Sequence, residues 1–159
     1  MGRLITDMAR SFGLPPLKRV AGVFTRLLPI AQPLLMVGPG ASARLGQAIG
    51  AFAHRKVLLV TDEVVRGLGL AQPLVDALAA AGTAFVVLDR IGADAPIPQV
   101  EDGLALLRDE DCDAVVAVGG GSVMDAAKAI ALAATNDKPL HELAGYFKGL
   151  HGPLPIYAV

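Results

Sequence analysis

Short apolar runs alternate with amphipathic stretches from residue 34 onward. The apolar runs are rich in β-branched residues and nearly continuous in hydrophobicity, as buried parallel strands are; they are Leu34–Val37, Val57–Thr61, Ala84–Leu88, Ala114–Val118 and Leu154–Val159. The amphipathic stretches predict helices of about three turns over Ser42–Ala53, Gln72–Ala81, Pro98–Glu110 and Ser122–Ala134. This alternation predicts an α/β fold in which helices cover both faces of a mostly parallel sheet.

The ends of the predicted helices carry suitable residues. Ser42 and Ser122 can accept hydrogen bonds from first-turn amides. Pro98 suits a first turn, and Gly82 suits the left-handed position after a helix. The last predicted strand ends with the chain itself at Val159. Because a strand needs flanking turns and partners, we expect the chain to be one part of a larger protein.

Residues 1–33 form a distinct basic segment. They carry five basic residues and one acidic residue (+4), whereas residues 34–159 carry nine basic and fourteen acidic residues (−5), which together give the net charge of −1. Apolar residues at helical spacing on both sides of Pro15-Pro16 predict two short amphipathic helices. Basic helices can lie on an anionic membrane, but these are shorter than the roughly 20 residues that span one. We favour packing against the rest of the protein or a second subunit, or partial disorder, over membrane binding.

Composition narrows the possible functions. The chain of 159 residues is long enough to bury a hydrophobic core without stabilising disulfides or metal ions. Its single cysteine, Cys112, excludes an intramolecular disulfide. A lone thiol suits a reducing compartment, so we expect a cytoplasmic protein. The acidic main region and an aromatic content of 4% argue against nucleic-acid binding. Because His54, His141 and His151 stand in unrelated contexts, we expect no metal site here.

Two glycine-rich segments could each hold a phosphate. The first, Gly38-Pro39-Gly40-Ala41-Ser42-Ala43, fits G-x-G-x-x-[G/A] between a predicted strand and a predicted helix. Asp62 follows at about the distance expected in dinucleotide-binding folds. However, Pro39 removes one amide donor, and a tight turn with Ser42 as a helix cap also explains the segment.

The second segment, Gly119-Gly120-Gly121, follows another predicted strand. Three glycines let the backbone approach a ligand without an intervening Cβ. The amides of Gly120, Gly121 and Ser122 would lie at a helix N-terminus, where free N–H groups and the helix dipole favour an anion. This segment therefore predicts a phosphate site.

Three polar residues near these segments have more than one interpretation. Ser122 and Asp125 fit the capping box S-x-x-[D/E], which explains them structurally but does not explain the three glycines. We expect Lys128 to pair with Asp125 on the helix surface. Asp62 can accept hydrogen bonds from both hydroxyls of an adenosine ribose and repel a 2′-phosphate, which favours NAD over NADP, or it can cap a helix that begins at Glu63.

The segment Gly119–Lys128 (GGGSVMDAAK) is similar to the G-G-G-S-x-x-D-x-A-K signature of the iron-containing (group III) alcohol dehydrogenases. Around it, Val57–Asp62, Val100–Gly103, Asp113 and Leu154–Val159 stand in the order of that family. The resemblance spans residues 34–159 and implies a Rossmann-like NAD-binding domain there, with residues 1–33 as a basic amphipathic extension.

The resemblance also implies a set of cofactor-binding residues. The triple-glycine loop would hold the pyrophosphate of NAD, and Gly38-Pro39-Gly40 would be only a turn. Asp94 is included because Asp94-Ala95-Pro96 falls where the family often has P-N-P near the cofactor. The implied residues are Asp62, Asp94, Gly120, Gly121, Ser122 and Asp125.

The resemblance further implies that this chain lacks the family's C-terminal helical domain, which binds iron or zinc through an aspartate and three histidines. We therefore expect the NAD-binding half of an enzyme that oxidises an alcohol to an aldehyde or ketone, with little or no turnover alone. Apolar surface left exposed would favour a homo-oligomer. The alternative is a stand-alone nucleotide-binding or interaction module without catalysis.

Overall fold

The computed structural model describes residues 34–136, 138–143, 149 and 151–159, and residues 36–159 form one compact unit. The helices predicted within residues 1–33 lie outside the described residues. None of the helices in the described part of the chain is long and apolar enough to cross a membrane. The described elements are α3 (Ala41–Ala51), β1 (Lys56–Val60), α4 (Glu63–Gly67), α5 (Gln72–Ala80), β2 (Ala84–Leu88), α6 (Ile97–Asp109), β3 (Ala114–Ala117), α7 (Gly121–Thr135), α8 (Leu140–Leu143) and β4 (Ile156–Ala158).

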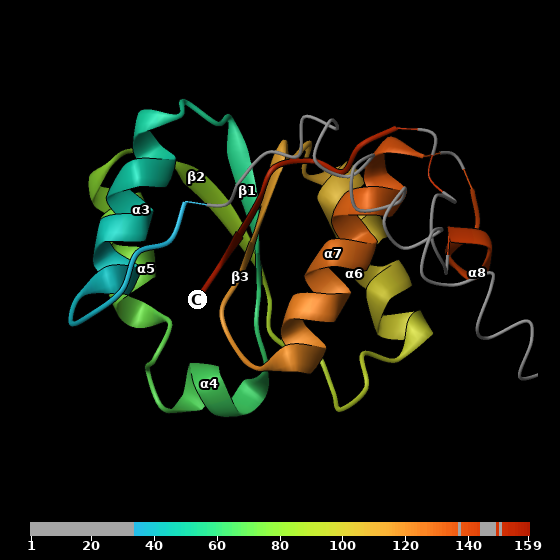
Figure 1. The fold of residues 1–159 in the computed structure, drawn as a ribbon, viewed down its shortest axis with the longest axis horizontal. Helices are drawn as coiled ribbons and strands as arrows, with labels where there is room; N and C mark the ends of the chain where they lie inside the picture. Colours follow the sequence, from blue (N-terminus) through green and yellow to red (C-terminus); the bar gives the residue numbers. More distant parts are fainter. Residues whose placement is uncertain (1–33, 137, 144–148, 150) are drawn as a thin grey trace, which may run out of the picture. The chain divides into compact units, whose positions relative to one another are not determined.

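The strands form one parallel sheet in the order β2-β1-β3-β4 (Figure 1). The two central strands are the most buried: every residue of β3 is buried, as are the last four of β1, whereas β2 and β4 are partly exposed. Continuous apolar runs form the centre of the sheet because helices cover both of its faces there. The predicted parallel α/β fold is confirmed.

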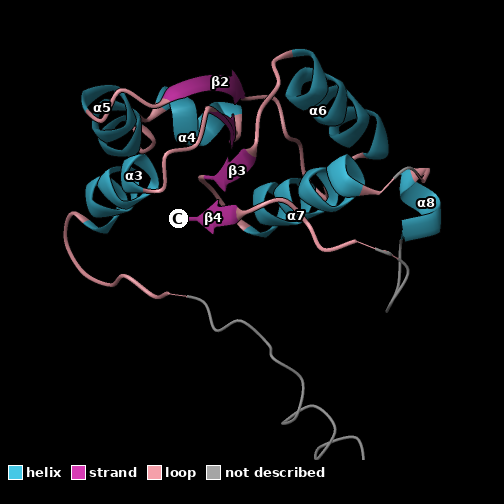
Figure 2. Ribbon diagram, turned by 90° about the horizontal axis from the view of Figure 1, so that it is seen from above, coloured by secondary structure: helices cyan, strands magenta, loops and turns pink. Residues whose placement is uncertain are grey.

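Successive residues of the central strands point to opposite helical layers. Leu58 and Val60 pack in a cluster with residues of α6 and α7, whereas Val57 and Leu59 pack in a second cluster with residues of α3 and α5. Figure 2 shows the sheet between these two pairs of helices. The alternation along each strand thus builds two cores, one on each face of the sheet.

Close approach of α6 to α7 and the sheet depends on Gly103. A Cβ at this position would lie 2.5 Å from Cδ1 of Ile130 and 2.7 Å from Cδ2 of Leu88, closer than carbon atoms can pack. Both of these neighbours are buried. A glycine therefore sets the spacing between this helix and the core.

Several predicted helix ends are confirmed by the backbone. Gly82 has a φ of 72°, and its N–H donates to the carbonyl of Ala79 just after α5. Pro98 lies in the first turn of α6. The prediction that Ser42 caps a helix is wrong, because α3 begins at Ala41, after Gly40 in a left-handed conformation, and no side chain caps it.

The strand predicted at Leu34–Val37 is not formed. These residues are irregular, and Leu34, Leu35 and Val37 are each more than three-quarters exposed. An apolar run becomes a strand only where a neighbouring strand accepts its hydrogen bonds, and no strand of the described sheet pairs with this one. The carbonyl of Val37 instead accepts a hydrogen bond from the Arg44 guanidinium at 3.1 Å.

Candidate functional site

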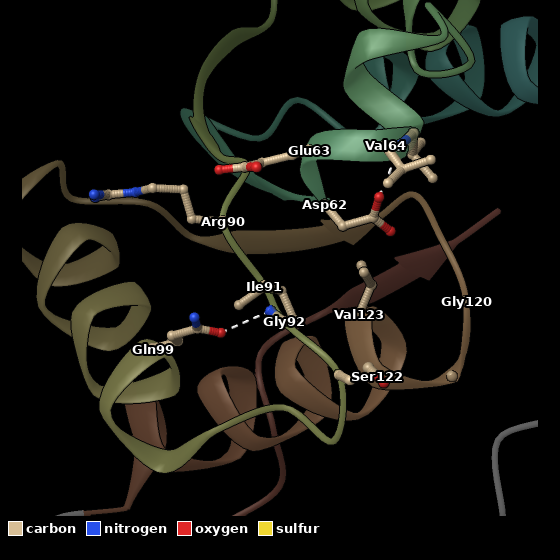
Figure 3. Close-up of a pocket in the computed structure, with 13 residues that line it drawn as sticks. Asp62, Glu63, Val64, Arg90, Ile91, Gly92, Gln99, Gly120, Ser122 and Val123 are labelled. Carbon is tan, nitrogen blue, oxygen red and sulfur yellow. Dashed lines mark hydrogen bonds between the residues drawn. The ribbon is translucent and has the colours of Figure 1, made fainter.

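A cavity of about 610 Å³ opens where the carboxyl ends of β1, β2 and β3 meet at one edge of the sheet (Figure 3). Loops after parallel strands are the usual ligand-binding region of open α/β folds. The cavity is lined by residues 62–65 after β1, 90–93 after β2, Gln99 of α6, and residues 120–123 after β3. Segments far apart in the sequence thus converge because three parallel strands end side by side.

Gly119 is required by the fold itself. Its φ is 154°, a conformation that other residues rarely adopt, and a Cβ there would lie 2.9 Å from Cγ2 of Val123. Its N–H donates to the carbonyl of Val159 at 3.0 Å, which ties the loop to the residue after β4. The loop therefore starts from a fixed position at the carboxyl end of β3.

Gly120 and Gly121 are glycines that the fold does not require. Neither has a positive φ, and a Cβ at either position would meet no heavy atom within 4 Å. Gly120 is the N-cap of α7, and no side chain caps the amides of the first turn. Uncapped amides at a helix N-terminus attract anions, and the missing side chains leave the backbone open to the cavity.

Ser122 does not cap α7, so the capping-box interpretation is wrong. The helix begins one residue earlier, at Gly121, and the Ser122 hydroxyl oxygen instead accepts a hydrogen bond from the Asp94 N–H at 3.1 Å. The Ser122 hydroxyl accepts in this bond, so its own proton is not used in it. The predicted pair of Asp125 with Lys128 is confirmed at 3.1 Å.

Asp62 lies at the end of β1 with its two carboxylate oxygens in different environments. Oδ1 accepts a hydrogen bond from the Val65 N–H at 2.8 Å and caps α4. Oδ2 lies on the side of the triple-glycine loop, 3.3 Å from where a Cβ of Gly119 would be. The two interpretations of Asp62 are therefore compatible, since one oxygen holds the helix and the other faces the site. Nearby, the buried Thr61 hydroxyl donates to the carbonyl of Val118 at 2.7 Å and joins the ends of β1 and β3.

The structure brings together four of the six candidate residues, Asp62, Gly120, Gly121 and Ser122. The side chains of Asp94 and Asp125 line a neighbouring cavity of about 330 Å³, which is otherwise mainly apolar. Asp94 reaches the first cavity only through its backbone bond to Ser122. It and Ala95 both have a positive φ, 60° and 47°, so the loop after β2 turns sharply at that contact.

Among the cavity residues that the sequence analysis missed are Arg90, Gly92 and Gln99. The N–H of Gly92 donates to Oε1 of Gln99 at 2.7 Å, so the loop after β2 is fastened to the first turn of α6. Arg90 could have been found from the rule that singled out Asp62, because it follows a predicted parallel strand by two residues. Gln99 gave no comparable signal, since its position depends on how α6 packs.

The other glycine segment forms a turn, as the resemblance implied. The N–H of Ala41 donates to the carbonyl of Gly38 at 3.1 Å, and the Arg44 guanidinium donates to the carbonyl of Pro39 at 2.7 Å. None of its residues lines the cavity.

A polar cluster near the amino ends of β1 and β3 surrounds His54. Its Nε2 lies 2.8 Å from the Tyr157 hydroxyl, and its Nδ1 lies 3.4 Å from a carboxylate oxygen of Asp113. Burial, and then the charge of Asp113, raise the pKa of Tyr157. The contacts of His54 with Tyr157 and Asp113 link β4 to the rest of the sheet.

Within residues 34–136, 138–143, 149 and 151–159, no three His, Cys, Asp or Glu side chains are grouped to hold a metal ion.

Comparisons with known proteins agree on one family. Residues 33–159 match the iron-containing alcohol dehydrogenases. The choline dehydrogenase of Bacillus subtilis (strain 168) is 37% identical over 120 residues, which is 74% of this chain and 30% of that protein. A crystal structure of 1,3-propanediol oxidoreductase has a TM-score of 0.72 and 36% identity, over 76% of this chain and 32% of its own.

A third relative was solved with a nucleotide bound. The sulfoacetaldehyde reductase of Bifidobacterium kashiwanohense, solved in complex with NAD+, has a TM-score of 0.69 and 29% identity, over 83% of this chain and 35% of its own. This chain therefore spans about a third of the length of the relatives that it matches.

Proposed function

The chain belongs to the iron-containing alcohol dehydrogenase family, and on this premise we propose that residues 34–159 bind NAD as the nucleotide-binding part of an alcohol dehydrogenase. One observation carries the proposal. Gly120 and Gly121 leave a bare backbone at an uncapped helix N-terminus, although nothing in the fold requires glycine there. A ligand that approaches the backbone closely explains both residues.

The donors and acceptors of the cavity fit the parts of a dinucleotide. The amides of Gly120 and Gly121 and the Ser122 hydroxyl would hold the pyrophosphate, which is an anion rich in acceptors. The free oxygen of Asp62 would accept hydrogen bonds from the hydroxyls of the adenosine ribose. Asp94 would hold the Ser122 hydroxyl in place through its backbone N–H. Asp125 is included because it lies near the N-terminus of α7, the helix end that would hold the pyrophosphate.

A preference for NAD over NADP follows from charge. Asp62 and Glu63 both line the cavity at the end of β1, where a 2′-phosphate would bring further negative charge. The relative solved in complex with NAD+ supports this choice.

The proposed activity belongs to the whole protein. NAD supplies the hydride acceptor when bound, while the residues of this chain bind and orient it. We propose that the whole protein oxidises an alcohol to an aldehyde or ketone, and that the iron or zinc of the family is held by residues other than those described. A cytoplasmic location is supported by the buried free thiol of Cys112.

Isothermal titration of the 159-residue chain with NADH, ADP-ribose and NADPH tests the proposal. We expect NADH and ADP-ribose to bind, because both carry the pyrophosphate and the adenosine ribose. NADPH should bind at least about tenfold more weakly, because a charge repulsion of about 1.4 kcal/mol has this effect. If the folded chain bound neither NADH nor ADP-ribose, the proposal would be wrong.

A further inference from the structure

Gln99 faces the proposed nucleotide site with an amide group whose orientation the protein fixes. The Gly92 N–H donates to Oε1 of Gln99 at 2.7 Å. A backbone N–H can only donate, so the carbonyl oxygen of Gln99, and not its NH₂ group, must face Gly92. Figure 3 shows the amide nitrogen turned away from Gly92, on the side of Arg90.

This arrangement leaves Gln99 with a donor and an acceptor side by side. The Gln99 NH₂ group donates to no other side chain or carbonyl in the described part of the chain, and Oε1 keeps a second lone pair beyond its bond to Gly92. Adenine carries the complementary pair, because its N6 amino group donates and a neighbouring ring nitrogen accepts. Gln99 is thus oriented for bidentate contact with that base.

If the dinucleotide binds as proposed, the order of the strands would bring its base near Gln99. Neighbouring strands lie about 4.8 Å apart, and the sheet order runs from β3 through β1 to β2. A pyrophosphate at Gly120 and a ribose at Asp62 therefore lead the next part of the nucleotide toward the end of β2. There Gly92 and Gln99 line the cavity, and Val64, which is 68% exposed, offers apolar surface for a flat ring.

We propose that Gln99 reads the base of the bound dinucleotide and selects adenine, with Gly92 as the positioning residue that fixes its amide. The inference rests on the proposed function, and it adds a specificity determinant in α6, an element outside the glycine signature. Hypoxanthine replaces the N6 donor of adenine with a carbonyl acceptor, which would face Oε1 of Gln99 and remove the match.

The test compares binding of NADH with binding of reduced nicotinamide hypoxanthine dinucleotide, in the wild-type chain and in Gln99→Glu and Gln99→Leu. We expect the wild type to bind NADH about tenfold more tightly, as one matched bidentate pair allows. Gln99→Glu keeps an acceptor for the Gly92 N–H but loses the donor, and Gln99→Leu loses both groups. Each variant should bring the two affinities to within about twofold.

Gln47→Glu, an exposed change on α3 that makes the same alteration in charge, is the matched control and should keep the wild-type ratio. Far-UV circular dichroism and the thermal midpoint confirm that each variant is folded. The inference is overturned if the wild type binds both dinucleotides equally, or if the ratio survives in Gln99→Glu and Gln99→Leu. A wild type that binds neither dinucleotide overturns the proposed function, and this inference with it.

Discussion

Two glycines of the loop after β3, Gly119 and Gly121, stand under different physical constraints. Gly119 has a φ of 154° and would collide with Val123 if it carried a side chain, whereas Gly121 lies in the first turn of α7 with open space around it. A requirement of the fold at Gly119 and the proposed requirement of ligand binding at Gly121 therefore occupy positions two residues apart. Mutation can separate them, because stability and binding are measured independently.

Gly119→Ala should lower the free energy of unfolding by about 1–3 kcal/mol, because the new Cβ overpacks against Val123 in an unfavourable conformation. Gly121→Ala should raise it by about 0.5–1 kcal/mol, since alanine is favoured over glycine in a helix. The same variant should weaken NADH binding about tenfold or more by filling the space beside the amides. Urea unfolding and calorimetric titration measure the two effects, and tight binding by Gly121→Ala would count against the site.

Asp62→Asn should change nucleotide preference without unfolding α4. Asparagine caps a helix about as well as aspartate, so its amide oxygen can accept the Val65 N–H and stability should stay within about 0.5 kcal/mol. Loss of the negative charge should improve NADPH binding relative to NADH. The ratio of the two dissociation constants measures this effect, and an unchanged ratio would remove Asp62 from the account of specificity.

Cys112 should be unreactive in the native protein. Burial raises the pKa of its thiol from 9.0 to about 11, and the side chain is 6% exposed. At pH 8 a disulfide reagent such as DTNB should label the native chain far more slowly than the urea-unfolded chain. Because the native pKa lies above the unfolded value, the native state should also lose stability as the pH rises from about 9 to 11. Rapid labelling of the native chain would contradict the burial.

At the scale of elements, the contact between α6 and α7 sets the shape of the site. Gln99 stands in the first turn of α6, and Gly121 and Ser122 stand in the first turn of α7. Both helices pack on the same face of the sheet. The distance between them depends on Gly103, which allows Ile130 and Leu88 to pack against its backbone.

Gly103→Ala should therefore lower the free energy of unfolding by about 1–3 kcal/mol, as overpacking of a core usually does. Gly67→Ala in α4 is the matched control, because a Cβ at Gly67 would meet no atom within 4 Å and should leave stability within about 0.5 kcal/mol. Equal stability of the two variants by urea unfolding would mean that α6 can shift without cost.

Regular elements could be predicted from the sequence where local pattern decides them. The strands β1, β2 and β3 and the helices α3, α5, α6 and α7 lie within two residues of the predicted ranges, because continuous apolar runs and helical spacing are local signals. The run at Leu34–Val37 carries the same signal but pairs with no strand of the described sheet. Pairing depends on distant segments, which a local pattern does not reveal.

The candidate site could be predicted only in part, for the same reason. Asp62 and the triple-glycine loop carry a signal because a strand end and a glycine run are visible locally. The partner of Ser122 could not be foreseen, since Asp94 reaches it by way of a sharp turn after β2. Gln99 was missed because only the packing of α6 brings it to the cavity.

At the scale of the whole molecule, apolar surface remains exposed around the sheet. Four large apolar side chains on this surface are each more than half exposed: Phe52 after α3, Val64 of α4, and Leu68 and Leu70 after α4. None of the residues of α4 is buried. Strand β4 also lies at the edge of the described sheet, and exposed edges and apolar patches favour association.

We therefore expect the chain to associate with itself in solution, with a homodimer as the smallest stable species. Size-exclusion chromatography with light scattering, at several protein concentrations, measures the mass directly. Adding Leu68→Lys and Leu70→Lys together should shift the distribution toward monomer, because the new charges oppose burial of that surface. A monomer at all concentrations in the unchanged chain would contradict this expectation.

The central claim is that the backbone amides after β3 bind a pyrophosphate. The most direct measurement is a titration of the ¹⁵N-labelled chain with ADP-ribose, followed through its amide resonances. We predict saturable shifts at Gly120, Gly121 and Ser122, with Gly38 and Gly40 unchanged. Unshifted resonances in the triple-glycine loop, or shifts confined to Gly38 and Gly40, would contradict the account.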